Sequence, residues 1–216
     1  METSKLTLTA TDLRAIDLLD SDYLNSKGAK QYGSENYADA VEYYRLAAAM
    51  GNSYAISNLG YCYLYGRHIE ANLSLAIAYF KIAASGGDVD AAYKLGDIYS
   101  SDKWGVKDQE LSIYYYRMAV GFVLAPGWEN STIIAQSQDL VKYPSLCYAL
   151  GRELSIGGAM NTDLSAAYQF LLKAKIGYKY ELMNGSRMYE KCYADVLDLL
   201  ADAQFDEVRP KESSHA

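Results

Sequence analysis

The sequence is poor in the residues that cross-link small folds and carry most enzyme chemistry. Its 216 residues include 3 cysteines, 3 prolines and 2 histidines. Cys62, Cys147 and Cys192 are far apart, and each lies beside a tyrosine in an apolar helical context, so we expect buried free thiols. With His68 and His215 as the only histidines, neither a histidine-based metal cluster nor a Ser-His-Asp triad has its parts. We therefore expect no enzyme, no catalytic residue, no metal and no cofactor.

Long apolar runs and phosphate-binding loops are missing as well. No stretch approaches the roughly 18 apolar residues that span a bilayer, and residues 1–10 lack the apolar core of a signal peptide. No Walker loop, G-x-G-x-x-G or C-x-x-C motif occurs. The net charge is −7 and no cluster of Lys and Arg reverses it locally, so the chain repels phosphate backbones. We expect a cytoplasmic protein that binds neither nucleic acid nor membranes.

The sequence does contain a repeat with a period of 36 residues. The segments YYRLAA, YFKIAA and YYRMAV begin at Tyr43, Tyr79 and Tyr115. A second marker, Leu-Gly-x-x-Tyr, begins at Leu59 and Leu95. Its Leu-Gly pair returns at residue 150, a step of 55 residues, and the first marker resumes after the same step at residue 170. Two independent markers thus place one insertion of 19 residues between the third and fourth repeats.

Each repeat is typical of two helices joined by a turn. Residues 55, 59, 60 and 63 share one helical face, which predicts the first helix. One repeat position before the second helix always carries a side chain that can cap it, and we expect N-caps at Asn72, Asp108 and Asp163. A glycine inside each first helix costs about 1 kcal/mol relative to alanine. We expect a tyrosine ring of the second helix to pack against Gly60, Gly96 and Gly151.

One repeat combines Ala55, Leu59, Gly60, Tyr63 and Gly66 with Asn72, Ala76, Tyr79, Phe80, Ala83, Ala84 and Gly87. With its counterparts this pattern covers residues 53–177 and resembles the Sel-one-like repeat family, relatives of tetratricopeptide repeats. The preceding unit keeps the same logic, from Gly28 to Tyr44, with a shorter loop. The resemblance implies an α/α superhelix used for protein–protein assembly. Some relatives have been discussed as β-lactam-binding or hydrolysing proteins with a cysteine pair in each repeat, and this sequence has no such pairs.

The expected fold is all-α: a right-handed α/α superhelix, or solenoid, of about four helical hairpins closed by a C-terminal capping helix. A single repeat domain is expected over residues 11–204. Its expected parts are repeats at 22–52, 53–88, 89–122 and 143–180, an insertion at 123–142 and a capping helix at 186–204. Residues 1–10 and 205–216 are expected to be a flexible arm and tail. At the start of the domain, Leu13, Ile16 and Leu19 share one side of a predicted amphipathic helix.

Tyrosine is abundant, with 22 residues against 4 phenylalanines and 2 tryptophans. Its ring suits positions that are buried at one end and wet at the other, which include core seams and binding grooves. We expect Tyr63, Tyr79, Tyr99 and Tyr115 to pack in the core. The first helices of such stacks line the concave side, and the positions counted there give the candidate partner-binding residues Tyr54, Ser57, Tyr61, Leu64, Tyr65, Asp90, Tyr93, Asp97, Tyr148 and Arg152. The alternative is that some of these rings pack between neighbouring repeats. Trp128 in the insertion is a further candidate contact.

Three functional hypotheses follow. The first is a non-catalytic scaffold or adaptor that holds a peptide or helix of a partner protein in a Tyr-rich concave groove. The second is a structural protein that self-associates through its end repeats or its insertion, with no foreign ligand. As to oligomeric state, we expect a monomer or a weak homo-oligomer. The third, a remote alternative, is a hydrolase that uses carboxylates of the groove such as Asp97.

Overall fold

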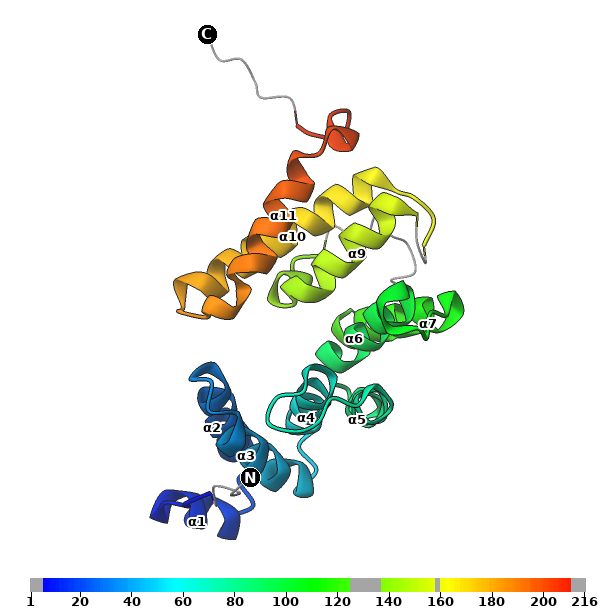
Figure 1. The fold of residues 1–216 in the computed structure, drawn as a ribbon. Coiled ribbons are helices and arrows are strands. Elements are labelled where there is room, and N and C mark those ends of the chain that lie inside the picture. Colours follow the sequence, from blue (N-terminus) through cyan, green and yellow to red (C-terminus); the bar gives the residue numbers. More distant parts are fainter. Residues whose placement is uncertain (1–5, 125–136, 158–159, 211–216) are drawn as a thin grey trace. The chain divides into compact units, whose positions relative to one another are not determined.

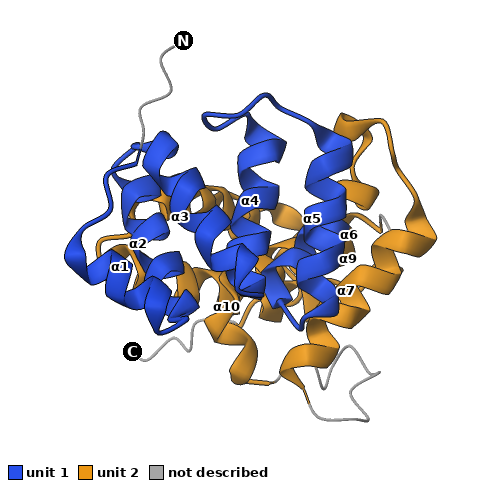
Figure 2. Cartoon of the chain, turned by 90° about the horizontal axis from the view of Figure 1, so that it is seen from below, with its two compact units in different colours: residues 1–95 blue, residues 96–216 orange. Residues whose placement is uncertain are grey.

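The computed structural model describes residues 6–124, 137–157 and 160–210, and the regular secondary structure in these residues is helical (Figure 1). The chain divides into two compact units, Met1–Leu95 and Gly96–Ala216, and the boundary falls inside one helix, α6 (Figure 2). Each unit is built from antiparallel helix pairs. The all-α repeat fold expected from the sequence is therefore confirmed in the described residues.

Unit 1 consists of two hairpins preceded by a short helix. Its elements are α1 (Ala10–Asp17), α2 (Ser21–Gly33), α3 (Tyr37–Ala49), α4 (Ser53–Tyr65), α5 (Leu73–Ser85) and the first part of α6 (Val89–Ser100). α2 packs against α3, α4 packs against α5, and α3 also contacts α4, so each hairpin is covered by the next. One core cluster lies between α1, α2, α3 and α4, and a second lies between α3 and α4.

Unit 2 begins with the end of α6 and closes with a helix that packs on the last hairpin. Its elements are a 3-10 turn η1 (Asp102–Trp104), α7 (Gln109–Val123), η2 (Asp139–Lys142), α9 (Pro144–Ile156), α10 (Leu164–Met183), η3 (Arg187–Tyr189), α11 (Glu190–Ala201) and η4 (Ala203–Phe205). α9 and α10 form the hairpin, and α11 packs against α10. Most of the expected insertion, including Trp128, lies outside the described residues.

The predicted N-caps are confirmed, and a backbone bond recurs beside each of them. Asn72, Asp108 and Asp163 accept from the amides of Leu75, Leu111 and Ala166 at 3.0, 3.0 and 2.9 Å. The backbone N–H of each cap residue also donates to the carbonyl nine positions earlier, at Tyr63, Tyr99 and Leu154. These paired bonds fix how each second helix turns back on its first helix.

The helical glycines allow close approach of the paired helix, as expected, but the neighbour is not always tyrosine. A Cβ at Gly96 would come within 2.7 Å of the Tyr116 ring. The expectation of a tyrosine is wrong for the other two repeats, because Phe80 lies against Gly60 and Leu171 lies against Gly151. The shared feature is therefore a bulky apolar side chain that packs against the backbone of the glycine, and a tyrosine hydroxyl is not required for this contact.

The N-terminal helix is oriented differently from the sequence-based expectation. Asp12 is fully buried, whereas Leu13 and Leu19 are exposed. Asp12 accepts hydrogen bonds from Thr9, Tyr23, Lys27 and Tyr43, the last at 3.0 Å. Burial alone would raise the pKa of this carboxyl, but the bonds from Lys27, Thr9 and Tyr43 hold it well below its usual value. The order also begins earlier than expected, since Leu6 and Leu8 pack on the first core cluster.

The C-terminal segment is folded beyond the expected start of the tail. Phe205 is fully buried, and its ring centroid lies 5.7 Å from that of Tyr168. Arg209 donates to the carbonyls of Leu200 and Asp202 at 2.8 and 2.7 Å. Packing and hydrogen bonds therefore hold the chain to Arg209, which corrects the expectation of a flexible tail from residue 205.

Candidate protein-interaction face

The cap of α4 also ties this helix to α2. Oδ1 of Asn52 accepts from the amide of Ala55 at 2.9 Å. Nδ2 of the same side chain donates to Asp22 at 2.8 Å and to Ser21 at 3.2 Å. The bond to Ala55 is buried and the two bonds to α2 are partly buried, and together they fix the first turn of α4. Tyr54, two residues further on, projects from this fixed turn.

A cluster of tyrosines joins α4 to the first part of α6. The Tyr61 hydroxyl donates to the Tyr93 hydroxyl at 3.3 Å. The Tyr61 ring meets Phe80 edge-on, with centroids 4.9 Å apart, and stacks on Tyr65 at 6.3 Å. The structure therefore brings together three of the predicted tyrosines in unit 1. They pack on the ring of Phe80, which itself lies against Gly60.

Lys94 places a positive charge against these rings. Its ammonium lies 5.1 Å from the ring centroid of Tyr93 and 5.7 Å from that of Tyr61, within cation–π range. Burial raises the pKa of Tyr61 well above its usual value, with further contributions from Tyr93 and the Asp90 carboxylate. The Tyr61 phenol thus stays protonated at neutral pH, and its single O–H is the donor in the bond to Tyr93.

Among the predicted residues of unit 1, some are exposed and some are buried, and Tyr61 is half-buried. Tyr54 is 57% exposed and Tyr65 is 47% exposed, and Asp90 is also exposed. Ser57 and Leu64 are only 3% and 6% exposed. The expectation that Ser57 and Leu64 line the surface is thereby corrected, because both lie on the buried side of α4. Tyr93 is also buried and acts through Tyr61.

Two polar features of the same face were not predicted from the sequence. One is Lys94, which stands 36 residues after Asn58 and so occupies the same repeat position. The other is the pair formed by Asn58 and Asn25, whose Nδ2 and Oδ1 atoms lie 3.0 Å apart and link α4 to α2. The repeat register contained the signal for both, because this position lies between two that were chosen, 57 and 61.

In unit 2 the predicted residues form an ion-pair group. Nη2 of Arg152 donates to Asp97 at 2.8 Å and to Glu153 at 3.1 Å, which ties α9 to the end of α6. Burial alone would lower the pKa of Arg152, but the adjacent Asp97 raises it above its usual range. Tyr148, one turn before Arg152 on α9, is half-buried, and burial raises its pKa.

A cleft in unit 2 opens beside this group. Its volume is about 830 Å³, and it lies between the end of α6, η1, the start of α7 and the end of α9. Its lining is polar and charged, with Ser100, Lys103, Lys107, Arg152 and Glu153 among the residues. Tyr99 and Ile156 also line the cleft, so it offers a partner both hydrogen-bonding groups and apolar surface.

The repeats match a known family. The Sel1 repeat matches residues 23–52, 53–88, 89–120 and 144–175, which together are more than half of the chain. The chain belongs to the Sel1 repeat family. The four Sel1 repeats coincide with the hairpins α2–α3, α4–α5, α6–α7 and α9–α10 and with the repeats expected from the sequence. Sel1 repeat proteins generally serve as protein-interaction scaffolds.

Solved structures of Sel1 repeat proteins share the fold. The chain is similar to a Sel1 repeat protein from Oxalobacter formigenes, with 18% identity and a TM-score of 0.52 over 83% of this chain and 86% of that one. It is also similar to a protective antigen of uropathogenic Escherichia coli that displays an SLR fold, with 20% identity and a TM-score of 0.52 over 83% of this chain and 40% of that one. The comparison with curated proteins gave no match.

Of the tyrosines predicted for the core of these Sel1 repeats, Tyr99 and Tyr115 are buried, as expected, whereas Tyr63 and Tyr79 are half-buried. The rings of Tyr63 and Tyr79 stack with centroids 5.3 Å apart, and those of Tyr99 and Tyr115 stack at 5.8 Å. Cys62 and Cys147 are buried free thiols, also as expected, whereas Cys192 is half-buried. Burial raises the pKa of Cys62 to about 11, which keeps the thiol protonated and unreactive at neutral pH.

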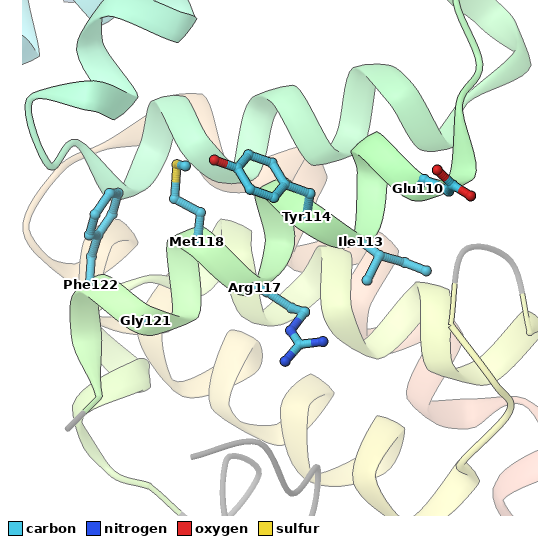
Figure 3. Close-up of a pocket in the computed structure, with 7 residues that line it drawn as sticks. All are labelled: Glu110, Ile113, Tyr114, Arg117, Met118, Gly121 and Phe122. Atoms are coloured by element: carbon cyan, nitrogen blue, oxygen red, sulfur yellow. The ribbon is translucent and has the colours of Figure 1, made fainter. Parts of the chain in front are cut away.

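The outer side of α7 carries a second, more apolar hollow. Figure 3 shows Tyr114, Met118 and Phe122 in a row along this helix, with Ile113 and Arg117 on the neighbouring flank. The hollow has a volume of about 620 Å³. In the described part of the chain, no helix is long and apolar enough to cross a membrane, and no group of three or more His, Cys, Asp or Glu residues could hold a metal ion.

Proposed function

We propose that this chain is a non-catalytic cytoplasmic scaffold that binds a peptide or helix of a partner protein on the tyrosine-lined face of its first helices. The central contact residues in unit 1 are Tyr54, Tyr61, Tyr65 and Asp90, with Tyr93 and Lys94 behind them. In unit 2 the corresponding contact residues are Asp97, Tyr148 and Arg152. The membership of the chain in a family of interaction scaffolds supports the coarse part of this proposal.

The proposal that the partner binds on the tyrosine-lined face rests on the preorganised side chains of the tyrosine cluster. Tyr61 is held by Tyr93, Phe80 and Lys94, so little of its side-chain freedom remains to be lost on binding. Tyr54 and Tyr65 present large, exposed rings on the same helix. Preorganised aromatic residues with a polar tip are enriched among the residues that dominate binding energy at protein interfaces.

The group in unit 2 adds polar contacts of a different kind. The Arg152 guanidinium has five N–H donors, and the bonds to Asp97 and Glu153 both leave from Nη2. The remaining donors point to a role in binding a carbonyl or carboxylate of the partner. A partner chain that contacts Tyr148 and Arg152 would therefore gain directional hydrogen bonds in addition to apolar burial.

The test is affinity capture with three versions of the chain as bait. The wild type is compared with the double variant Tyr54→Ala and Tyr65→Ala, which removes two exposed rings without opening the core. The matched control is Tyr114→Ala, because Tyr114 is 54% exposed but lies on α7. We expect proteins captured by the wild type and the control to be lost from the double variant. Equal recovery on all three baits would contradict the proposed face.

The hydrolase alternative makes a separate prediction. If the groove carboxylates carried a reaction, the variant Asp97→Asn would abolish a turnover that the wild type shows reproducibly. We expect no such turnover, because Asp97 instead anchors Arg152 at 2.8 Å.

A further inference from the structure

The outer side of α1 exposes apolar side chains although the helix buries a charged one. Leu13, Leu18 and Leu19 are each more than half exposed, whereas the Asp12 carboxylate is fully buried. Terminal elements of repeat proteins normally present a polar outer surface to water. Leu18 and Leu19 follow directly after the last residue of α1, and together with the exposed carboxylates of Asp17 and Asp20 they form a surface that we call the α1 face.

A second apolar surface lies on the last helix of the fourth repeat. Ile176, Tyr180 and Met183 are also more than half exposed, and their spacing of four and three residues places them on one side of α10. The exposed Lys179 stands on the same side of α10, and the exposed Arg187 follows four residues after Met183. We call this surface the α10 face.

The two faces are complementary in both apolar character and charge. In the sequence around the α1 face the carboxylates of Asp17, Asp20 and Asp22 outnumber the guanidinium of Arg14. Lys179 and Arg187 are the exposed charged residues in and just after the last part of α10, where Glu181 is half-buried and accepts from Ser186. Contiguous exposed apolar residues bordered by polar groups are typical of interaction surfaces. We propose that the α1 face of one copy of this chain docks on the α10 face of a second copy.

Such a contact joins two different surfaces and is therefore heterologous. A copy that has docked through its α1 face still offers its α10 face to a third copy, so association continues into rings or longer assemblies. The tyrosine-lined face does not take part, and this proposal stands whether or not the proposed function is correct. Because each face consists of only a few residues on or next to one helix, we expect a weak contact, with dissociation constants in about the micromolar range.

Sedimentation velocity with complementary variants tests this arrangement. Wild-type protein is run between about 10 and 500 µM, a range chosen for a weak contact. We expect its weight-average mass to rise with concentration. Leu18→Asp disables the α1 face and Met183→Asp disables the α10 face, and we expect each variant alone to remain monomeric. An equimolar mixture of the two should form a species of twice the monomer mass and nothing larger, because each variant retains the face that the other has lost.

The control is Ile82→Asp, which places the same charge on an exposed apolar position of α5 and should associate like the wild type. Circular dichroism verifies that every variant keeps the helical content of the wild type. If an aspartate variant fails this check, Leu18→Gln or Met183→Gln replaces it, with an expected weakening of at least tenfold. A wild type that stays monomeric at the highest concentration overturns the proposal. So does a mixture of the two variants that does not dimerise, since that result would exclude a heterologous contact between these faces.

Discussion

Asp88 caps α6 in the same way that Asn52, 36 residues earlier, caps α4. The side-chain oxygen of each accepts from the amide three residues further on, at 2.6 Å from Ala91 and 2.9 Å from Ala55. The second polar atom differs between the two. Nδ2 of Asn52 donates to Asp22 and Ser21, whereas Oδ2 of Asp88 is buried and has no hydrogen-bond partner among the described residues. Burial raises the pKa of Asp88 to about 6, and the nearby Asp90 adds to this rise.

This difference predicts that Asp88→Asn stabilises the protein at neutral and alkaline pH. The pKa of Asp88 is higher in the folded state, about 6, than the usual 3.8, so protonation favours folding. The stability that Asp88 contributes is therefore fully present below about pH 4 and is lost as the pH rises through about 6. Asparagine keeps the cap acceptor without the charge, and we expect the free energy of unfolding to increase by about 1–3 kcal/mol at pH 8 and little at pH 4.

Urea denaturation at pH 4, 6 and 8 measures this effect. The matched control is Asp108→Asn, because Asp108 caps α7 in the same manner but is exposed. We expect the control to change stability by less than about 0.5 kcal/mol at each pH, since Asn and Asp are nearly equal as caps. A gain for Asp88→Asn that does not depend on pH would show that its ionisation is not the cause.

Gly96→Ala should destabilise the protein because its Cβ would meet the Tyr116 ring. The three nearest ring atoms lie at 2.7, 2.8 and 2.9 Å from the position of that Cβ. Overpacking of this kind costs about 1–3 kcal/mol. Gly33→Ala is the control, because a Cβ at this exposed end of α2 meets nothing within 4 Å and alanine is the better helix former. Thermal unfolding should show a lower melting temperature for Gly96→Ala but not for Gly33→Ala. Equal melting temperatures of the two variants would mean that Tyr116 does not pack tightly against Gly96.

Asp12→Ala should destabilise unit 1 more than any other single removal of a carboxylate near the N-terminus. The substitution leaves the ammonium of Lys27 without its ion-pair partner and removes the acceptor for the Tyr43 hydroxyl. Breaking a buried ion pair in this way costs about 3–5 kcal/mol. Asp17→Ala, on the exposed side of the same helix, should cost less than about 0.5 kcal/mol. Denaturant titrations of both variants compare the two losses, and a similar small loss for each would refute the role given to the network.

The repeat, the hairpins and the caps could be predicted because each depends on residues that are close together in the sequence or that recur at a fixed spacing. The spacing of Gly60 and Gly96 gives the period, and a cap such as Asn72 bonds to an amide three residues away. The network around Asp12 could not be predicted, because its partners Lys27 and Tyr43 lie 15 and 31 residues further on and polar side chains carry no periodic signal. The packing of Phe205 on Tyr168 is equally long-range.

Candidate-site residues were predicted by position but not by exposure. Repeat counting places Ser57 on the same face as Tyr54, yet neighbouring helices bury Ser57 and leave Tyr54 in water. Periodicity reports which side of a helix faces inward, and the size of the side chains around it decides how much of that side water can reach. Lys94 was missed because its contacts depend on burial. A lysine is normally expected to extend into solvent, whereas Lys94 is buried and its ammonium lies against the rings of Tyr61 and Tyr93.

The most direct test of the scaffold function is a calorimetric titration of a purified partner, obtained by the affinity capture described above, into the wild type and the double variant Tyr54→Ala and Tyr65→Ala. Loss of two aromatic side chains at the centre of an interface costs more than about 1.4 kcal/mol, so we predict a dissociation constant at least tenfold larger for the double variant. Tyr114→Ala should bind within about twofold of the wild type, because its ring lies on α7. Equal affinity of the wild type and the double variant would contradict the account.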